Sequence, residues 1–218
     1  MKKIIYSLMA FALLGAVSCE SMLDIPKKGA VAYETYYASD ADAEAAITSM
    51  YANFVQQVAG TEGIDNPEQV MLNYAADDVM AAGGHDADHA PFRYFCEFTY
   101  DNANGTLKEA YQRYMFAIYH ANLVISNFTN ENKAGAEPKW TSDYTEQVVA
   151  EARVMRAYLH LMLALSWECP PIVNRLQEGD DLPTNAASQD EVLEFVVNEC
   201  QKAIDSGKLP KRNGQGDK

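Results

Sequence analysis

The sequence predicts an all-α protein in which paired antiparallel helices form a bundle or a tetratricopeptide-like helical array with long loops. Two observations support this fold class. Apolar residues recur every three or four positions in several long segments, which is the period of an amphipathic helix. No run of alternating apolar and polar residues lies between turn signals, as a sheet would require. With 48% hydrophobic residues, the chain is globular rather than disordered.

Start and stop signals divide the chain into five expected helices. Ser39 is an N-cap followed by acidic residues, and Pro67 stands at a first helical position. Thr106 with Glu109, and Ser188 with Glu191, have the spacing of a capping box. Paired prolines end the fourth helix. The expected helices cover about 40–58, 67–82, 106–128, 143–167 and 188–206.

The helix expected over 143–167 carries the clearest pattern. Two apolar stripes predict that its C-terminal half is buried on two sides. The arginines Arg153 and Arg156 are expected to pair with carboxylates or to cap neighbouring loops. The stripes consist of Val148, Ala152, Met155, Leu159, Met162 and Ser166, and of Val154, Tyr158, Leu161 and Leu165. On the last helix the expected stripe is Leu193, Val196, Val197, Cys200 and Ile204. An array cut at an internal repeat exposes an apolar face, so Leu193, Val196, Val197 and Ile204 are expected near the exposed end. The tyrosines at helical spacing are expected in the core, namely Tyr111, Tyr114, Tyr119 and Tyr158.

Residues 83–105 are expected to form a long loop that is rich in aromatic residues. Sugar rings stack on aromatic faces, and carboxylates hydrogen-bond to sugar hydroxyls. The loop and the acidic pair Asp77 and Asp78 before it therefore form our candidate ligand surface. The alternative is that the aromatic rings are buried and pin the loop onto the helices, because large aromatic side chains mostly bury area. The candidate residues are Asp77, Asp78, Phe92, Arg93, Tyr94 and Phe95.

The same loop contains His85, Asp86, Asp88 and His89, which are residue types that bind metal ions. Glycines flank this segment and argue against a helix that would align the two histidines. We therefore favour a solvated polar loop over a metal site.

The N-terminus has the pattern of an export signal. Lys2 and Lys3 precede an apolar run from Ile4 to Val17, which is too short to span a bilayer. Cys19 follows small residues, and at this position in a bacterial signal a diacylglycerol thioether forms. We expect a lipid on Cys19 to anchor the protein, and the alternative is an ordinary cleaved signal followed by a chance cysteine.

Charge and motif content exclude several function classes. The formal net charge of −14 disfavours binding to nucleic acid or to an anionic membrane surface, so the lipid alone is expected to hold the chain at the membrane. No G-x-S-x-G, H-E-x-x-H or phosphate-binding glycine loop occurs in the sequence. We therefore do not expect an enzyme. Cys96, Cys169 and Cys200 are expected to be mostly buried, and their pairing stays open.

Several segments, taken in order, resemble the SusD/RagB family of outer-membrane nutrient-binding lipoproteins. The segment Cys19–Pro26 is similar to the family's mature N-terminus, and Glu151–Tyr158 followed by Trp167–Ile172 is the best stretch. There are departures, because Glu168 stands where the family usually has Gly, and Tyr111 and Met115 stand where Trp and Tyr are common. Weaker similarities lie at Tyr51, Ala76–Asp78, Ile118 with Ala121–Asn122, Ser188–Val192 and Cys200–Ala203.

The resemblance implies a lipid-anchored protein of the cell outer membrane, facing the exterior. It implies that the protein binds glycans or peptides and delivers them to a TonB-dependent SusC-like transporter, without a cofactor or chemistry on the ligand. Because family members are much longer, we expect an N-terminal portion, a truncated product or a split reading frame. The alternative is a helical interaction scaffold or inactive remnant. The expected divisions are a signal over 1–18, an anchor and tether over 19–38, a SusD-like helical domain over 39–209 and a polar tail over 210–218.

Overall fold

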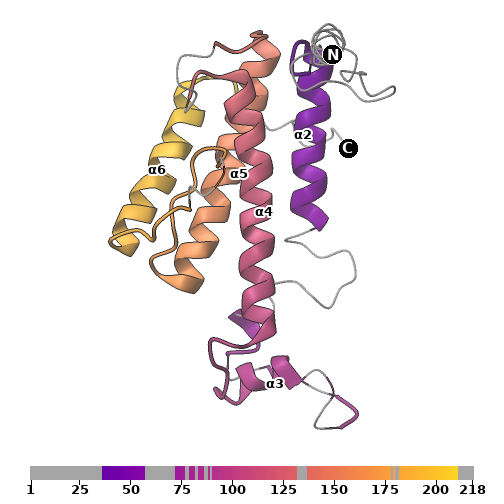
Figure 1. Cartoon of the computed structure of the whole chain (residues 1–218), viewed down its shortest axis with the longest axis vertical. Helices are drawn as coiled ribbons and strands as arrows, with labels where there is room; N and C mark the ends of the chain where they lie inside the picture. Colours follow the sequence, from indigo (N-terminus) through magenta and orange to yellow (C-terminus); the bar gives the residue numbers. More distant parts are fainter. Residues whose placement is uncertain are drawn as a thin grey trace, which may run out of the picture. The chain divides into compact units, whose positions relative to one another are not determined.

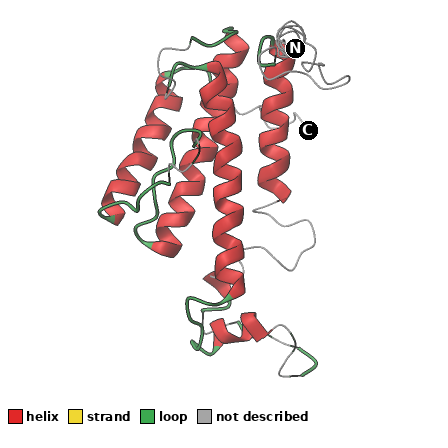
Figure 2. Ribbon diagram, in the orientation of Figure 1, coloured by secondary structure: helices red, strands yellow, loops and turns green. Residues whose placement is uncertain are grey.

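The regular secondary structure of the described residues consists of helices joined by loops, which confirms the all-α prediction (Figure 2). Cys19 and the expected signal lie outside the described residues, as do 67–71 of the expected second helix and 211–218 of the expected tail. The computed structural model describes residues 36–56, 72–76, 79–81, 83–85, 88, 90–131, 137–177, 179 and 182–210. Its helices are α2 (Asp40–Phe54), α3 (Ala90–Cys96), α4 (Gly105–Phe128), α5 (Asp143–Trp167) and α6 (Gln189–Asp205).

The helices form a tetratricopeptide-like array, in which consecutive long helices run antiparallel (Figure 1). The two longest helices, α4 and α5, pack against each other at the centre. Helix α2 packs on both of them, and α6 packs on α5. Short α3 contacts α4 beside its N-terminal end.

Side-chain caps place most helix starts where the sequence predicts them. The Ser39 hydroxyl accepts a hydrogen bond from the Asp42 amide, and the Ser188 hydroxyl accepts one from the Glu191 amide. Helix α5 has the predicted bounds, and a capping box between Ser142 and Thr145 fixes its start. At its C-terminus Glu168 adopts φ +59°, in the region that favours glycine. This conformation explains why a Gly would be usual there.

Three expectations for the second quarter of the chain are wrong. The helix expected over 67–82 ends earlier than predicted, since Leu72 and Asn73 are in a π-helical turn, 74–76 form a turn and bend, and 79–81 are irregular. Tyr74 and Ala81 pack against the core beside α3. The long loop contains α3. Helix α4 does not start with a capping box at Thr106, because the Asn104 side chain is the N-cap and accepts from the Thr106 amide at 2.9 Å.

The core consists of two clusters along the α4–α5 pair. One is formed by the end of α4 and the start of α5, with α2 packed on them, and includes Ile47, Ile125 and Val148. The other joins the start of α4 and the end of α5 to α3. Burying apolar area at roughly 25 cal/mol per Å² makes these clusters the main source of stability.

The second apolar stripe predicted for α5 is only partly buried, since Tyr158 packs against the core and Leu161 is half-buried. Val154 and Leu165 in that stripe are exposed, while the first stripe is largely buried. On α6, Val197 and Ile204 are exposed, as expected for these residues, Leu193, Val196 and Cys200 are half-buried, and the helix buries Val192, Glu199 and Ala203. The buried side of α6 therefore includes a charge.

That charge is Glu199, which pairs with Arg156 of α5. Both side chains are 0% exposed, and the Arg156 guanidinium donates to Glu199 Oε2 from Nη2 at 2.5 Å and from Nε at 3.0 Å. Arg153 and Lys202 also donate to Glu199, at 3.2 and 3.1 Å. Arg153 also pairs with Glu131, which follows α4. The expectation that both arginines pair with carboxylates is confirmed.

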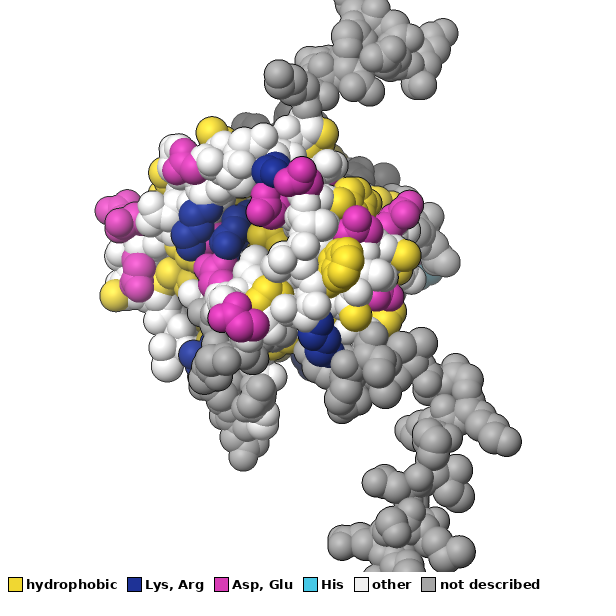
Figure 3. Space-filling model, turned by 90° about the horizontal axis from the view of Figure 1, so that it is seen from above, with side chains coloured by type: hydrophobic (Ala, Val, Ile, Leu, Met, Phe, Trp, Pro, Cys, Tyr) yellow, Lys and Arg dark blue, Asp and Glu magenta, His cyan; other side chains and the backbone are white. Residues whose placement is uncertain are grey.

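Surface charges are also paired close to their partners. Lys208, beyond α6, lies 2.7 Å from Asp143 and 2.9 Å from Glu146 at the start of α5. Figure 3 shows basic side chains lying next to acidic ones on the face that it presents, rather than forming a basic patch.

Glu199→Gln is expected to lower the free energy of unfolding by about 3 kcal/mol, because it leaves the buried Arg156 guanidinium without its counter-charge. Urea denaturation at pH 7 measures this change. Glu194→Gln is the matched control on the exposed side of α6, and it should change stability by less than about 0.5 kcal/mol. Equal effects of the two substitutions would contradict the assignment.

Candidate functional site

The loop between α5 and α6 folds back on itself to form two adjacent arms. Pro171 and Asn185 form an antiparallel bridge, and the Ala186 amide donates to the Pro170 carbonyl at 3.3 Å. The first arm begins at Pro170, directly after the turn at Glu168. The second arm leads into Ser188, the N-cap of α6. The loop is therefore held at its base by backbone contacts.

Buried side chains of α4 and α5 hold the first arm. Asn122 Nδ2 donates to the carbonyls of Val173 and Arg175, at 3.0 and 3.2 Å. Arg156 Nη1 donates to the Asn174 carbonyl at 2.9 Å and to Asn122 Oδ1 at 2.7 Å. The ion pair between α5 and α6 thus continues directly into the backbone of this loop.

His160 provides the fourth attachment of the first arm. Its Nε2 accepts from the Val173 amide at 3.0 Å, so the proton of the neutral ring is on Nδ1, which donates to the Arg156 carbonyl at 2.8 Å. Burial lowers the pKa of His160 to about 4. The ring therefore stays neutral at pH 7 and keeps Nε2 available as the acceptor for the loop.

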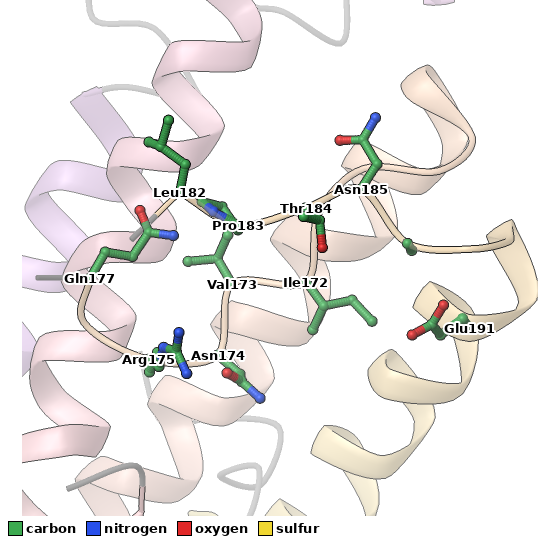
Figure 4. Close-up of a pocket in the computed structure, with 11 residues that line it drawn as sticks. Ile172, Val173, Asn174, Arg175, Gln177, Leu182, Pro183, Thr184, Asn185 and Glu191 are labelled. Atoms are coloured by element: carbon green, nitrogen blue, oxygen red, sulfur yellow. The ribbon is translucent and has the colours of Figure 1, made fainter. Parts of the chain in front are cut away.

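Figure 4 shows the outer hollow, which lies between the loop arms and the start of α6 and has a volume of about 410 Å³. The polar side chains on its wall include Asn174, Thr184 and Asn185. The Glu191 carboxylate on the α6 side accepts from the Ala187 amide at 2.8 Å, so it caps the helix. Ile172 and Leu182 supply apolar surface.

An inner hollow of about 540 Å³ lies between the loop and α4. Its α4 wall is formed by Tyr111, Met115 and Tyr119, together with Asn122. The two hollows share a set of loop residues, which are Val173, Arg175, Gln177, Leu182, Pro183 and Asn185. One loop therefore presents the same polar side chains to two hollows, of which only the inner one has an aromatic wall.

The lining of the inner hollow suits a ligand with one apolar face and several hydroxyls. Tyrosine rings offer flat apolar surface, while the side chains of Arg175, Gln177 and Asn185 offer hydrogen-bond donors and acceptors. Both volumes fall in the range of small-molecule sites. Among the residues that the structure describes, no group of three or more His, Cys, Asp or Glu is placed to hold a metal ion.

The candidate surface predicted from sequence is only partly on the outside. Phe92 is 5% exposed and Phe95 is 2% exposed, so their rings belong to the core and pin α3 onto α4, in agreement with the alternative. Tyr94 is exposed, and the Arg93 guanidinium lies 5.8 Å from its ring centroid. Asp77 and Asp78, and also Asp86 and His89 of the metal hypothesis, lie outside the described residues.

Sequence reasoning missed the hollows of the α5–α6 loop. Asn174, Arg175, Gln177 and Asn185 have no spacing that marks them, because they meet only when the arms fold together. Tyr119 was expected in the core, but it is exposed on the edge of the inner hollow. The concentration of Asn, Gln and Arg between two helices was the one available signal.

The effect of pH on stability tests the neutral state of His160. Because the folded pKa of about 4 lies below the unfolded value of about 6.5, this residue stabilises the fold fully above pH 6.5 and loses that contribution as pH falls towards 4. From pH 7 to 4.5 the loss is roughly 2 kcal/mol. Urea denaturation should show a smaller acid loss for His160→Gln and an unchanged one for the exposed-site control His85→Gln. An acid loss for His160→Gln equal to that of the wild type would contradict the assignment.

No described helix is both long enough and apolar enough to cross a membrane. Among solved structures, the chain is similar to a laminarin-binding SusD-like protein, with 19% identity, a TM-score of 0.65, and coverage of 80% of this chain and 35% of that one. It is also similar to surface glycan-binding protein A from Bacteroides fluxus, with 20% identity, a TM-score of 0.62, and coverage of 83% and 36%. These similarities show a shared fold.

Sequence comparison gives the family. A SusD-like protein of Bacteroides ovatus is 23% identical over 200 residues, which are 89% of this chain and 33% of that protein. The chain therefore spans about a third of the length of this curated relative. Residues 30–207 match the SusD-like family that is described as starch-binding and associating with the outer membrane. The match covers most of the chain and confirms the resemblance found in the sequence, so this chain belongs to the SusD-like family.

Proposed function

We propose that this chain is part of a surface lipoprotein that binds glycans and delivers them to a TonB-dependent SusC-like transporter in the outer membrane. The observation that carries this proposal is the family match over residues 30–207. Names of structural neighbours support it, since one is a laminarin-binding protein and another is a surface glycan-binding protein.

The geometry of the α5–α6 loop supports glycan binding in particular. A sugar ring has an apolar face of C–H groups and a rim of hydroxyls, and the inner hollow has an aromatic wall opposite polar side chains. Buried hydrogen bonds hold the first arm in place, so little conformational entropy is lost when a ligand binds. Arg93 and Tyr94 on α3 are a second proposed contact surface, together with Asp77 and Asp78.

The proposed localisation rests on Cys19 and on the outer-membrane description of the family. Lipid chains on Cys19 would hold the protein at the outer membrane with its helices in water, facing the exterior. We propose binding and delivery without chemistry on the ligand, so the protein is not assigned an enzymatic activity. A peptide ligand is the alternative cargo.

Affinity gel electrophoresis of the full chain tests the proposal, with laminarin, xyloglucan, starch, mannan, arabinogalactan, polygalacturonate and alginate embedded in separate gels. At least one polysaccharide should retard the protein. Gln177→Ala/Asn185→Ala should weaken that retardation about tenfold, because two hydrogen-bonding side chains of the loop are lost.

The matched control is Asn198→Ala/Gln201→Ala, which removes the same side-chain types from exposed positions on α6 and should bind like the wild type. If no polysaccharide retards the wild type, glycan binding by this chain is wrong, and a helical scaffold or an inactive remnant becomes the better account.

A further inference from the structure

The outer face of α4 carries a cluster of three aromatic rings. Phe116 is 46% exposed and Tyr119 is 47% exposed, and their rings are nearly parallel, with centroids 6.4 Å apart and an interplanar angle of 23°. His120 packs edge-on against both rings, at 4.9 and 5.5 Å between centroids. Burial lowers the pKa of His120, so it supports the two rings as a neutral side chain near pH 7.

This cluster is continuous with the inner hollow. Tyr119 belongs to both, and it follows Tyr111 and Met115 at helical spacing on the same side of α4. A row of ring and thioether surface therefore leads from inside the hollow, over Tyr119, to Phe116 outside it. Single exposed apolar side chains are common on protein surfaces, but a contiguous row that enters a polar-lined hollow indicates a binding surface.

The row of aromatic and thioether side chains on α4 lies opposite loop side chains that can hydrogen-bond to sugar hydroxyls. Leu182 and Pro183 close the hollow on the loop side, and Gln177 and Asn185 bring amides to it. In Figure 4, Gln177 and Leu182 extend from the loop toward the α4 side. A sugar ring lying on Tyr119 would therefore have hydrogen-bonding groups of the loop at its rim, and the next ring of the same chain would lie over Phe116.

Charge favours an uncharged ligand. The chain has a net charge of −14. A glycan that carries carboxylates or sulfates would meet unfavourable electrostatics along its approach. Hydroxyls of a neutral glycan have no such penalty and can use the amides of Gln177 and Asn185.

We propose that Tyr119 and Phe116 form a stacking shelf that extends the inner hollow, so that the site takes a neutral oligosaccharide of at least two rings in preference to a single sugar. The inference rests on the proposed glycan binding. It adds the ligand class, the residues of α4 that hold it, and a dependence of affinity on chain length.

The test uses the full chain and the same panel of polysaccharides. The wild type should be retarded by a neutral polysaccharide and not by polygalacturonate or alginate. Isothermal titration with the dimer and the hexamer of that neutral polysaccharide should show about tenfold tighter binding of the hexamer. Phe116→Ala should remove most of this preference and leave dimer affinity nearly unchanged. Tyr119→Ala should weaken both about tenfold, and Tyr119→Phe should restore the stacking.

The control is Tyr51→Ala, which removes a ring of similar exposure from α2, where its hydroxyl donates to Glu151 at 2.8 Å. Because Phe116 and Tyr119 are half exposed, their variants should melt like the wild type. Neutral-glycan binding that survives Tyr119→Ala, equal affinity for dimer and hexamer, or a preference for polygalacturonate would each overturn the shelf while leaving glycan binding intact. Absence of binding to the whole panel would overturn both proposals.

Discussion

The buried ion pair between Arg156 and Glu199 is the constraint on which the described structure depends. Neither side chain reaches water, so each needs counter-charges to remain charged inside the fold, and these are the other member of the pair together with Arg153, Lys202 and Glu131. Glu199 lies with Val192 and Ala203 on the buried side of α6, and its ion pair with Arg156 ties that side to α5. The position of α6 therefore follows from a charge that the core must satisfy.

The Arg156 guanidinium also holds in place the loop that we propose binds the ligand. Arg156 reaches the Asn174 carbonyl and the Asn122 side chain, and Asn122 in turn holds the carbonyls of Val173 and Arg175. A set of buried polar groups thus joins α4, α5, α6 and the first loop arm. Buried networks of this kind favour one arrangement of the backbone, because any other arrangement leaves polar groups unsatisfied. The first arm, which lines both hollows, is accordingly held in place before a ligand binds.

Helix caps and helix bounds depend on residues that are close in sequence, and the sequence predicted several of them correctly. The bounds of α5 and the caps at Ser39 and Ser188 follow from side chains that bond within three positions. Periodicity did not separate buried from exposed apolar residues, so Leu165 and Tyr119 were wrongly expected inside. Burial there depends on which neighbours each helix has, and one helix's sequence does not contain that information.

The candidate site was harder to predict for a related reason. Aromatic content marked the segment around α3, yet Phe92 and Phe95 serve the core, and the hollows are built by residues of the α5–α6 loop without a motif. The resemblance to SusD-like proteins indicated the family, and the structure showed the hollows that support the proposed function. Since the chain spans about a third of its curated relative, transporter delivery concerns the whole protein.

A substitution at Asn122 tests how the buried network holds the loop, separately from the ion pair between α5 and α6. Asn122 is buried, it touches no charge on α6, and it donates to two carbonyls of the first arm. The most direct measurement is hydrogen–deuterium exchange across residues 172–177 in Asn122→Ala and in the wild type, at equal temperature and pH. Our account predicts that exchange there rises at least about tenfold, since each lost buried hydrogen bond costs about 1 kcal/mol or more, while exchange in α6 stays the same. Unchanged exchange in the loop would contradict the claim that the buried network holds the site.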